Sequence, residues 1–170
     1  VTRAEVTEEA AKHVGALALS LHARGIEPHR AAHFLVQLLF CLFAEDVGLL
    51  PKELFTRLIR FTSQHPEQFP AQVEQLFGEM RDGGFVNYEE ILHFNGGLFA
   101  EIDVVPLTKG EIEVLVHASR LDWSSIEPAI IGTLFERSLD PKRRSQIGAH
   151  YTSRADIERG VERHRRRRQP

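Results

Sequence analysis

Cysteine and long apolar runs are scarce in this sequence. Its 170 residues include a single cysteine, which excludes an internal disulfide and is typical of a reducing compartment. No basic segment followed by an apolar one opens the chain, so we expect no signal peptide. The most apolar run, residues 34–44, is too short to cross a bilayer. These absences predict a cytoplasmic protein with no membrane partner.

Motifs of known catalytic and metal sites are also absent. The sequence has no Walker-type phosphate loop, no Gly-x-Gly-x-x-Gly, no cysteine pair for zinc and no His-Glu-x-x-His. His29 and His33 are spaced for one helical face, but no third ligand follows at a telling distance, so we predict no metal site. Glu45 and Asp46 close an apolar helix at the end where the helix dipole disfavours acidic groups. We expect this pair to join helices through an Arg or Lys partner, and we predict no catalytic residue.

Charge is unevenly distributed along the chain. Residues 141–170 carry ten Lys or Arg and three Asp or Glu, a balance of +7. Subtracting them from the chain's 21 basic and 24 acidic residues leaves 11 basic and 21 acidic residues in 1–140, a balance of −10. Because phosphate contacts need Lys and Arg, we expect any DNA contact to come from the C-terminal segment or from local basic patches.

The spacing of apolar residues is helical over most of the chain. Thr2 with Glu5 and Thr108 with Glu111 form capping-box patterns that predict helix starts. Helices are expected at about 2–23, 28–47, 52–63, 70–81, 108–118 and from 124 onward. The segment 85–102 is mixed and shows no strand alternation of useful length, so we expect a single helical turn and a structured aromatic turn there.

These patterns predict an all-α fold, a single helical domain of about six helices with a basic, poorly ordered C-terminal tail. The helical domain is expected over 1–140, a linker over 141–157 and an Arg-rich tail over 158–170. The spacing places Val6, Ala10, Val14, Leu17 and Leu21 on one stripe of the first helix. The expected core side of the third helix is Leu54, Phe55, Leu58, Ile59 and Phe61. The expected centre of the core is Phe34, Leu38, Leu42, Ile130, Leu134 and Phe135.

Four segments carry a more specific pattern. They are FLVQLLFCLFAEDVGLLP at 34–51, FNGGLFAE at 94–101, DWSSIEPAIIGTLFERSLDP at 122–141 and SQIGAHYTSRADI at 145–157. In this order and spacing they resemble the helical spacer domain of MmeI-like, type IIL restriction–modification enzymes. Such enzymes combine a nuclease, a helical linker, an adenine DNA methyltransferase and a target-recognition domain. The resemblance implies a non-catalytic spacer fragment that connects nuclease and methyltransferase domains and is inactive alone.

The resemblance also implies roles for C-terminal residues. Gly148, Tyr151 and Thr152 match the Gly-x-x-Tyr-Thr turn beside the S-adenosylmethionine pocket of such methyltransferases, where they would form the rim of an incomplete cofactor site. A loop that ends in a helix cap explains the same residues equally simply. Lys142 and the adjacent Arg143 and Arg144 are candidates for DNA contact, or serve solubility alone.

Several family features are missing, and they leave an alternative open. The sequence contains no nuclease motif, no Asp/Asn-Pro-Pro-Tyr loop and no Gly-rich cofactor strand, and its end, ERGVERHRRRRQP, departs from the family pattern. We therefore expect a truncated or frame-shifted fragment whose partners are nuclease, methyltransferase or specificity domains. The alternative is a free-standing protein-interaction module that also self-associates. Its candidate contact face is Leu98, Phe99, Val104, Val105 and Trp123.

Overall fold

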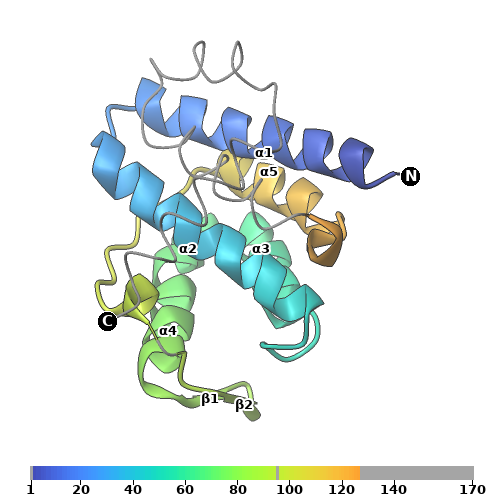
Figure 1. Ribbon diagram of the computed structural model, residues 1–170. Coiled ribbons are helices and arrows are strands. Elements are labelled where there is room, and N and C mark those ends of the chain that lie inside the picture. The colour runs from blue at the N-terminus through green and yellow to red at the C-terminus, as the bar shows by residue number, and fades with distance from the viewer. Residues whose placement is uncertain (1, 95, 127–170) are drawn as a thin grey trace, which may run out of the picture. The chain divides into compact units, whose positions relative to one another are not determined.

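Helices dominate the part of the chain that the structure describes. The structure is a computed structural model, and it describes residues 2–94 and 96–126. This part contains five α-helices, three short 3-10 turns and one two-stranded sheet (Figure 1). The all-α prediction is therefore confirmed, with a small hairpin added. The expected helix from residue 124 onward, the linker and the tail lie mostly or wholly outside the described residues.

The chain divides into two compact units, with the boundary inside the second helix. One unit is His33–Ser124, and the other contains the described residues on either side of it.

The N-terminal residues form α1, Arg3–Ala23, as the sequence predicts. The capping box is present, because the Thr2 hydroxyl accepts the Glu5 N–H and the Glu5 carboxylate accepts the Thr2 N–H, both at 3.2 Å. The predicted stripe is confirmed, and its five residues are all buried. The helix ends at Ala23 with Arg24 as its C-cap, and Gly25 follows with a φ of 78°. A glycine adopts this left-handed backbone without the steric cost that a side chain adds.

Glu27 begins the second helix, α2, which spans Pro28–Asp46. Its carboxylate accepts the N–H groups of His29 and Arg30 at 3.0 and 2.9 Å. The backbone N–H groups of these two residues, His29 first, lower the pKa of Glu27. Pro28 at the first helical position lacks an N–H that would otherwise need a partner. The start of α2 is thus set by a side-chain cap and a proline.

Within His33–Ser124, the apolar part of α2 is buried. Phe34, Leu38 and Leu42 are fully buried, which confirms the described half of the predicted core. The ring of Phe34 meets the rings of Phe69 and Phe77 at centroid distances of 6.2 and 6.0 Å. Edge-to-face and tilted ring pairs of this kind add to the free energy gained by burying their area.

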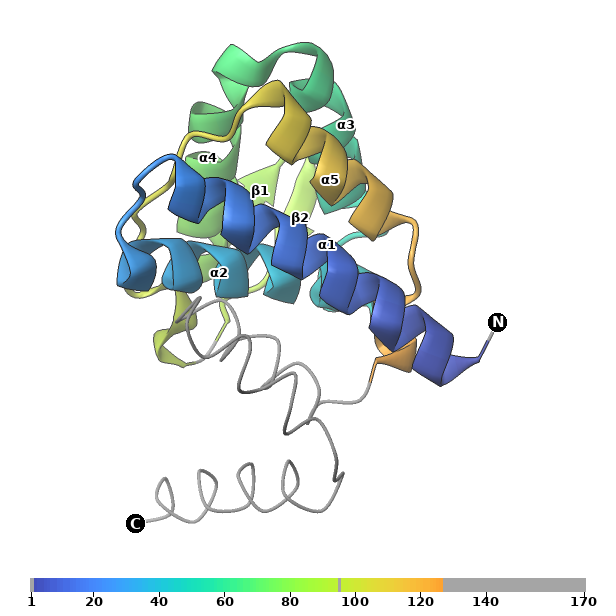
Figure 2. The same cartoon turned by 90° about the horizontal axis from the view of Figure 1, so that it is seen from above.

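Three further helices complete this unit. They are α3, Leu54–Gln64; α4, Phe69–Asp82; and α5, Lys109–Ser119. Helices α3 and α5 lie side by side, which both views show (Figures 1 and 2). The capping box of Thr108 and Glu111 is present at the start of α5, as predicted.

The hairpin is the part of the fold that the sequence pattern misses. Strand β1, Gly84–Val86, pairs antiparallel with β2, Glu89–Ile91, beside α4 (Figure 1). The expectation of a helical turn here is wrong. A Cβ on Gly84 would lie 1.7 Å from the Glu79 carboxylate, which is the far end of a flexible side chain that can move aside. Each strand has only three residues, which are too few to show a clear alternation of apolar and polar side chains.

Candidate functional site

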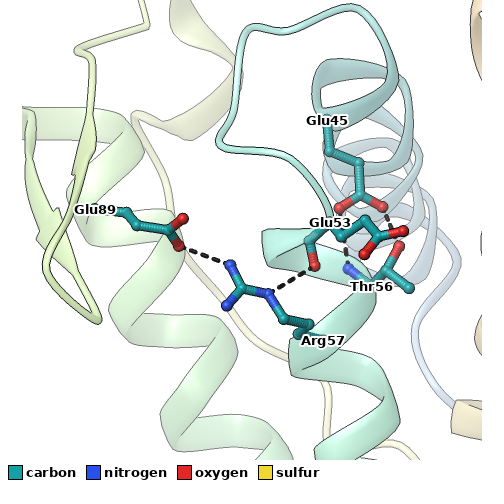
Figure 3. Close-up of polar contacts among 5 residues, drawn as sticks. All are labelled: Glu45, Glu53, Thr56, Arg57 and Glu89. Carbon is teal, nitrogen blue, oxygen red and sulfur yellow. Dashed lines mark hydrogen bonds and ion pairs between the residues drawn. The ribbon is translucent and has the colours of Figure 1, made fainter.

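The C-terminal end of α2 is a polar junction, which we call the α2 junction and define by Glu45, Asp46, Thr56 and Trp123. The Glu45 carboxylate accepts the backbone N–H of Thr56 at 3.0 Å and also its hydroxyl (Figure 3). Glu45 is only 7% exposed, and Thr56 is buried as well. These contacts connect the end of α2 to the first turn of α3.

The backbone of α3 explains why Glu45 is needed there. Its N-cap residue, Glu53, has a left-handed backbone with φ at 58° and gives no side-chain cap. The first N–H groups of a helix have no partner within the helix, so a carboxylate from elsewhere is a suitable acceptor. Glu45 therefore acts as the cap of α3 from eleven residues upstream.

Burial and hydrogen bonding act on Glu45 in opposite directions. Burial raises the pKa of Glu45, the hydrogen bonds from Thr56 lower it, and the net direction is upward. A raised pKa means that burial disfavours the charged carboxylate more than its bonds favour it.

Asp46 makes the second contact of the α2 junction. Its carboxylate accepts the backbone N–H of Trp123 at 2.8 Å, and the Trp123 indole N–H donates to the Ala118 carbonyl at 2.8 Å. Burial, ahead of the other causes, raises the pKa of Asp46. The predicted joining role of the pair is thus confirmed, but the predicted Arg or Lys partner is wrong. Both acids bond to backbone N–H groups, which no search for cationic side chains in a sequence detects.

A second set of contacts fixes the turn within FNGGLFAE. The Gln37 amide donates to the carbonyls of Leu98 and Glu101 at 2.9 and 3.0 Å, and the His33 ring lies 3.1 Å from the same Glu101 carbonyl. The side-chain carbonyl of Gln37 is buried without a partner. A lone polar residue inside FLVQLLFCLFA is the signal by which this contact could have been found from the sequence.

Aromatic rings enclose the same turn. Phe99 lies against Phe40, Phe77 and Phe94 at centroid distances of 5.8, 5.1 and 6.3 Å. Phe40 and Phe94 also meet edge to face at 5.4 Å. The predicted aromatic turn is confirmed, and its packing gives it a structural role.

The contact face expected for an interaction module is largely wrong. Phe99, Val105 and Trp123 are buried in the core, and Leu98 and Val104 are partly buried. Large apolar side chains are more often buried in the core than exposed on the surface. The exposed apolar residues lie elsewhere.

Some of the other candidate site residues lie within the described part of the chain, and some lie outside it. Among the described residues, no group of three or more His, Cys, Asp or Glu is placed to bind a metal ion. The cofactor-rim candidates Gly148, Tyr151 and Thr152 lie outside the described residues, and so do Lys142 and the two arginines after it. No described helix has the length and apolar character that a membrane crossing requires.

Comparison with known proteins shows which family residues 29–99 resemble. Residues 29–99 match the family described as "MmeI, helicase spacer domain". The solved structure of the type IIL restriction–modification enzyme MmeI in complex with DNA is similar over 90% of this chain, with 34% sequence identity and a TM-score of 0.68. Residues 29–99 form an MmeI-like spacer domain. The predicted resemblance is therefore confirmed.

A methyltransferase relative supports the same conclusion. DNA methyltransferase A of Bacillus subtilis (strain 168) is 30% identical over 134 residues, which cover 73% of this chain. The chain spans only 15% of that relative and 22% of the MmeI chain. The MmeI-like spacer domain thus corresponds to a small part of much longer proteins, and it contains the whole α2 junction except Trp123.

Proposed function

We propose that this protein is a non-catalytic spacer that connects the nuclease and methyltransferase domains of a restriction–modification enzyme. The observation that carries the proposal is the likeness of 90% of this chain to 22% of the MmeI structure. The polar groups of the α2 junction support it, because their carboxylates bond to backbone N–H groups and stabilise the fold. A spacer needs a fixed shape more than a reactive group.

The proposed spacer acts in the cytoplasm, next to domains that act on DNA. Gly148, Tyr151 and Thr152 are proposed as the rim of an S-adenosylmethionine site that neighbouring residues of a longer enzyme would complete. Lys142 and the following Arg143 and Arg144 are proposed to contact DNA, because residues 141–170 have a net positive charge and residues 1–140 a net negative one. The chain alone is proposed to have no catalytic activity.

Calorimetric titration of the purified chain with S-adenosylmethionine tests the non-catalytic part of the proposal. We expect no heat of binding, and no methyl transfer to duplex DNA from labelled cofactor. Tyr151→Ala is the matched variant. Micromolar binding that this substitution removes would mean a working cofactor pocket, and it would overturn the proposal.

The connecting role needs a separate experiment. In a chimera, this chain replaces the matching segment of MmeI, and modification and cleavage of DNA are both measured. We expect both activities to survive, because a spacer contributes its shape. A chimera that folds, as judged by circular dichroism and a single melting transition, but lacks both activities contradicts the connecting role.

One observation favours a second function, a protein-interaction module. Phe85 and Leu92 are 66% and 62% exposed, and Tyr88 at the hairpin tip is fully exposed. Exposed apolar patches are typical of contact surfaces, and these three residues lie in or next to one hairpin. Sedimentation velocity over a range of concentrations tests whether this hairpin causes self-association. A size that rises with concentration and returns to a monomer with Tyr88→Ser supports the module, and a constant monomer rejects this form of it.

A further inference from the structure

The hairpin exposes apolar side chains on the face that points away from the core. Phe85 of β1 lies directly opposite Glu90 of β2, so the two side chains share one face of the hairpin. Leu92 follows Glu90 by two residues, which is the spacing at which side chains of an extended chain point the same way. All three residues are exposed, and we call them the hairpin outer face.

The opposite face of the hairpin is already packed. Val86 and Ile91 are buried, and β1 lies against α4 (Figure 1). When one face of an antiparallel sheet is packed on the core and the other meets water, the outward side chains are usually polar. Phe85 and Leu92 depart from this pattern, so the hairpin outer face has the composition of a surface that a partner covers.

The base of the hairpin is held to the end of α4. The Phe94 N–H donates to the Met80 carbonyl at 2.9 Å, and Nδ1 of the His93 ring lies 2.5 Å from the Arg81 carbonyl oxygen. A surface that is already fixed in place loses little conformational entropy when a partner binds. The hairpin outer face is therefore presented at low cost.

The charge of the hairpin is negative. Residues 83–94 contain two Glu and no Lys or Arg. Glu89 pairs with Arg57 at 2.7 Å (Figure 3). Among the described residues, Glu90 has no ion-pair partner. It is an uncompensated charge between two exposed apolar side chains.

These features define the chemistry of a partner. A partner that covers Phe85 and Leu92 also removes Glu90 from water, and a buried charge without a counter-charge is costly. A cation on the partner offsets this cost. A second copy of the chain offers no cation through the same face, and nucleic acids and anionic membranes carry charge of the same sign as Glu90.

We propose that the hairpin outer face binds a segment of another polypeptide in which a Lys or Arg lies between apolar side chains. The cation pairs with Glu90, and the apolar side chains pack on Phe85 and Leu92. The inference rests on the second proposed function, the protein-interaction module, and names the class of its partner. It does not depend on whether the chain connects a nuclease and a methyltransferase.

The test begins with a selection from a phage-displayed library of random peptides, with the full chain as bait. We expect the enriched peptides to carry Lys or Arg between apolar residues. With Glu90→Lys as bait, the charged position should change to Asp or Glu, because the charge of the face is reversed. Glu74→Lys is the matched control. It reverses an exposed acid on α4, so it should select the same basic peptides as the parent chain.

Fluorescence anisotropy of a labelled enriched peptide then measures binding to each variant. We expect Glu90→Lys to weaken binding about tenfold or more, and replacement of the peptide's cation by Glu to restore it. Phe85→Ser should also weaken binding about tenfold or more, as truncation of a central aromatic contact does. Leu19→Ser removes an exposed apolar residue of α1 and should leave binding unchanged. All of these side chains are exposed, so the variants should fold, which circular dichroism checks.

Four outcomes would overturn the inference. The first is a selection without charge preference, or with a preference for acidic peptides. The second is an equal loss of binding in Glu90→Lys and Glu74→Lys, which would mean that only net charge matters. The third is self-association of the chain that Phe85→Ser removes, which would assign the face to a second copy. The fourth is binding to phosphatidylcholine vesicles that needs Phe85 but not Glu90, which would assign the face to lipid.

The same measurements separate a failure of the inference from a failure of the module. If the enriched peptides bind through Phe85 but are insensitive to Glu90, the protein-interaction module stands and the partner class is wrong. If no enriched peptide depends on either residue, the module fails as well. The spacer role is tested by cofactor binding and by the chimera, so it fails independently of both.

Discussion

Glu45 offers the sharpest test of how the α2 junction stabilises the fold. Substitution by Ala removes the acceptor of the Thr56 N–H and of its hydroxyl. Both groups are buried, so neither gains water as a replacement. A buried polar group left without a partner costs about 1–3 kcal/mol, and loss of a helix cap costs about 0.5–2 kcal/mol.

These two costs overlap, and removal of a buried carboxylate offsets part of them. We therefore expect Glu45→Ala to lower the free energy of unfolding by about 2 kcal/mol. Glu45→Gln keeps a carbonyl for the Thr56 N–H and should cost about 1 kcal/mol or less. Glu53→Ala is the matched control, because this nearby carboxylate gives no side-chain cap. We expect its effect to stay within about 0.5 kcal/mol.

The pH dependence of stability tests the role of Glu45 independently, because the raised pKa of Glu45 fixes the direction of the change. Burial raises the pKa of Glu45 in the folded state, so the folded protein binds a proton more tightly than the unfolded chain does. The contribution of this group is largest below its unfolded pKa of about 4.3 and is lost as the pH rises through the folded pKa. Glu45→Gln should abolish this contribution.

Urea unfolding monitored by circular dichroism at several pH values measures both effects. The reasoning fails if Glu45→Ala and Glu53→Ala cost the same. It also fails if Glu45→Gln leaves the difference in stability between pH 4 and pH 7 unchanged.

Three other substitutions test separate parts of the fold in the same urea assay. Leu38→Ala should cost about 2–5 kcal/mol because Leu38 is fully buried, and a cost below about 1 kcal/mol would contradict its central place. Tyr88→Gly should stabilise the protein by up to about 1 kcal/mol, because Tyr88 has a φ of 66° that glycine adopts without strain; destabilisation would mean that its ring has a contact to lose. Gln37→Glu should cost about 3 kcal/mol, more than Gln37→Leu at about 1 kcal/mol, because a buried carboxylate would face two carbonyl oxygens. Equal costs would mean that the amide donates to neither.

Local signals explain why most helix boundaries could be predicted. Side-chain caps such as Thr2 with Glu5 and Thr108 with Glu111 act within four residues, so a short stretch of sequence contains both partners. The long apolar run of α2 likewise predicts burial on all sides. These elements follow from neighbours in the chain.

Long-range partners explain the errors. Phe61 has the apolar character of a core residue, but the buried face of α3 is formed by Phe55, Ile59 and Thr62, which leaves its ring outside. The partners of Glu45 and Asp46 are backbone N–H groups supplied by distant segments. A backbone group has no letter of its own in a sequence, so only the fold reveals which carboxylate it meets.

The α2 junction also determines where the chain can change in length. Glu45 and Thr56 are eleven residues apart and share hydrogen bonds, so a change in the length of residues 47–53 should disturb these bonds. An inserted residue there would shift the first turn of α3 away from its cap. The hairpin tip at Tyr88 lies on the surface, since Tyr88 is fully exposed. A peptide tag or a fluorescent label is therefore best inserted at the hairpin tip, and related proteins should vary in length there before they vary between α2 and α3.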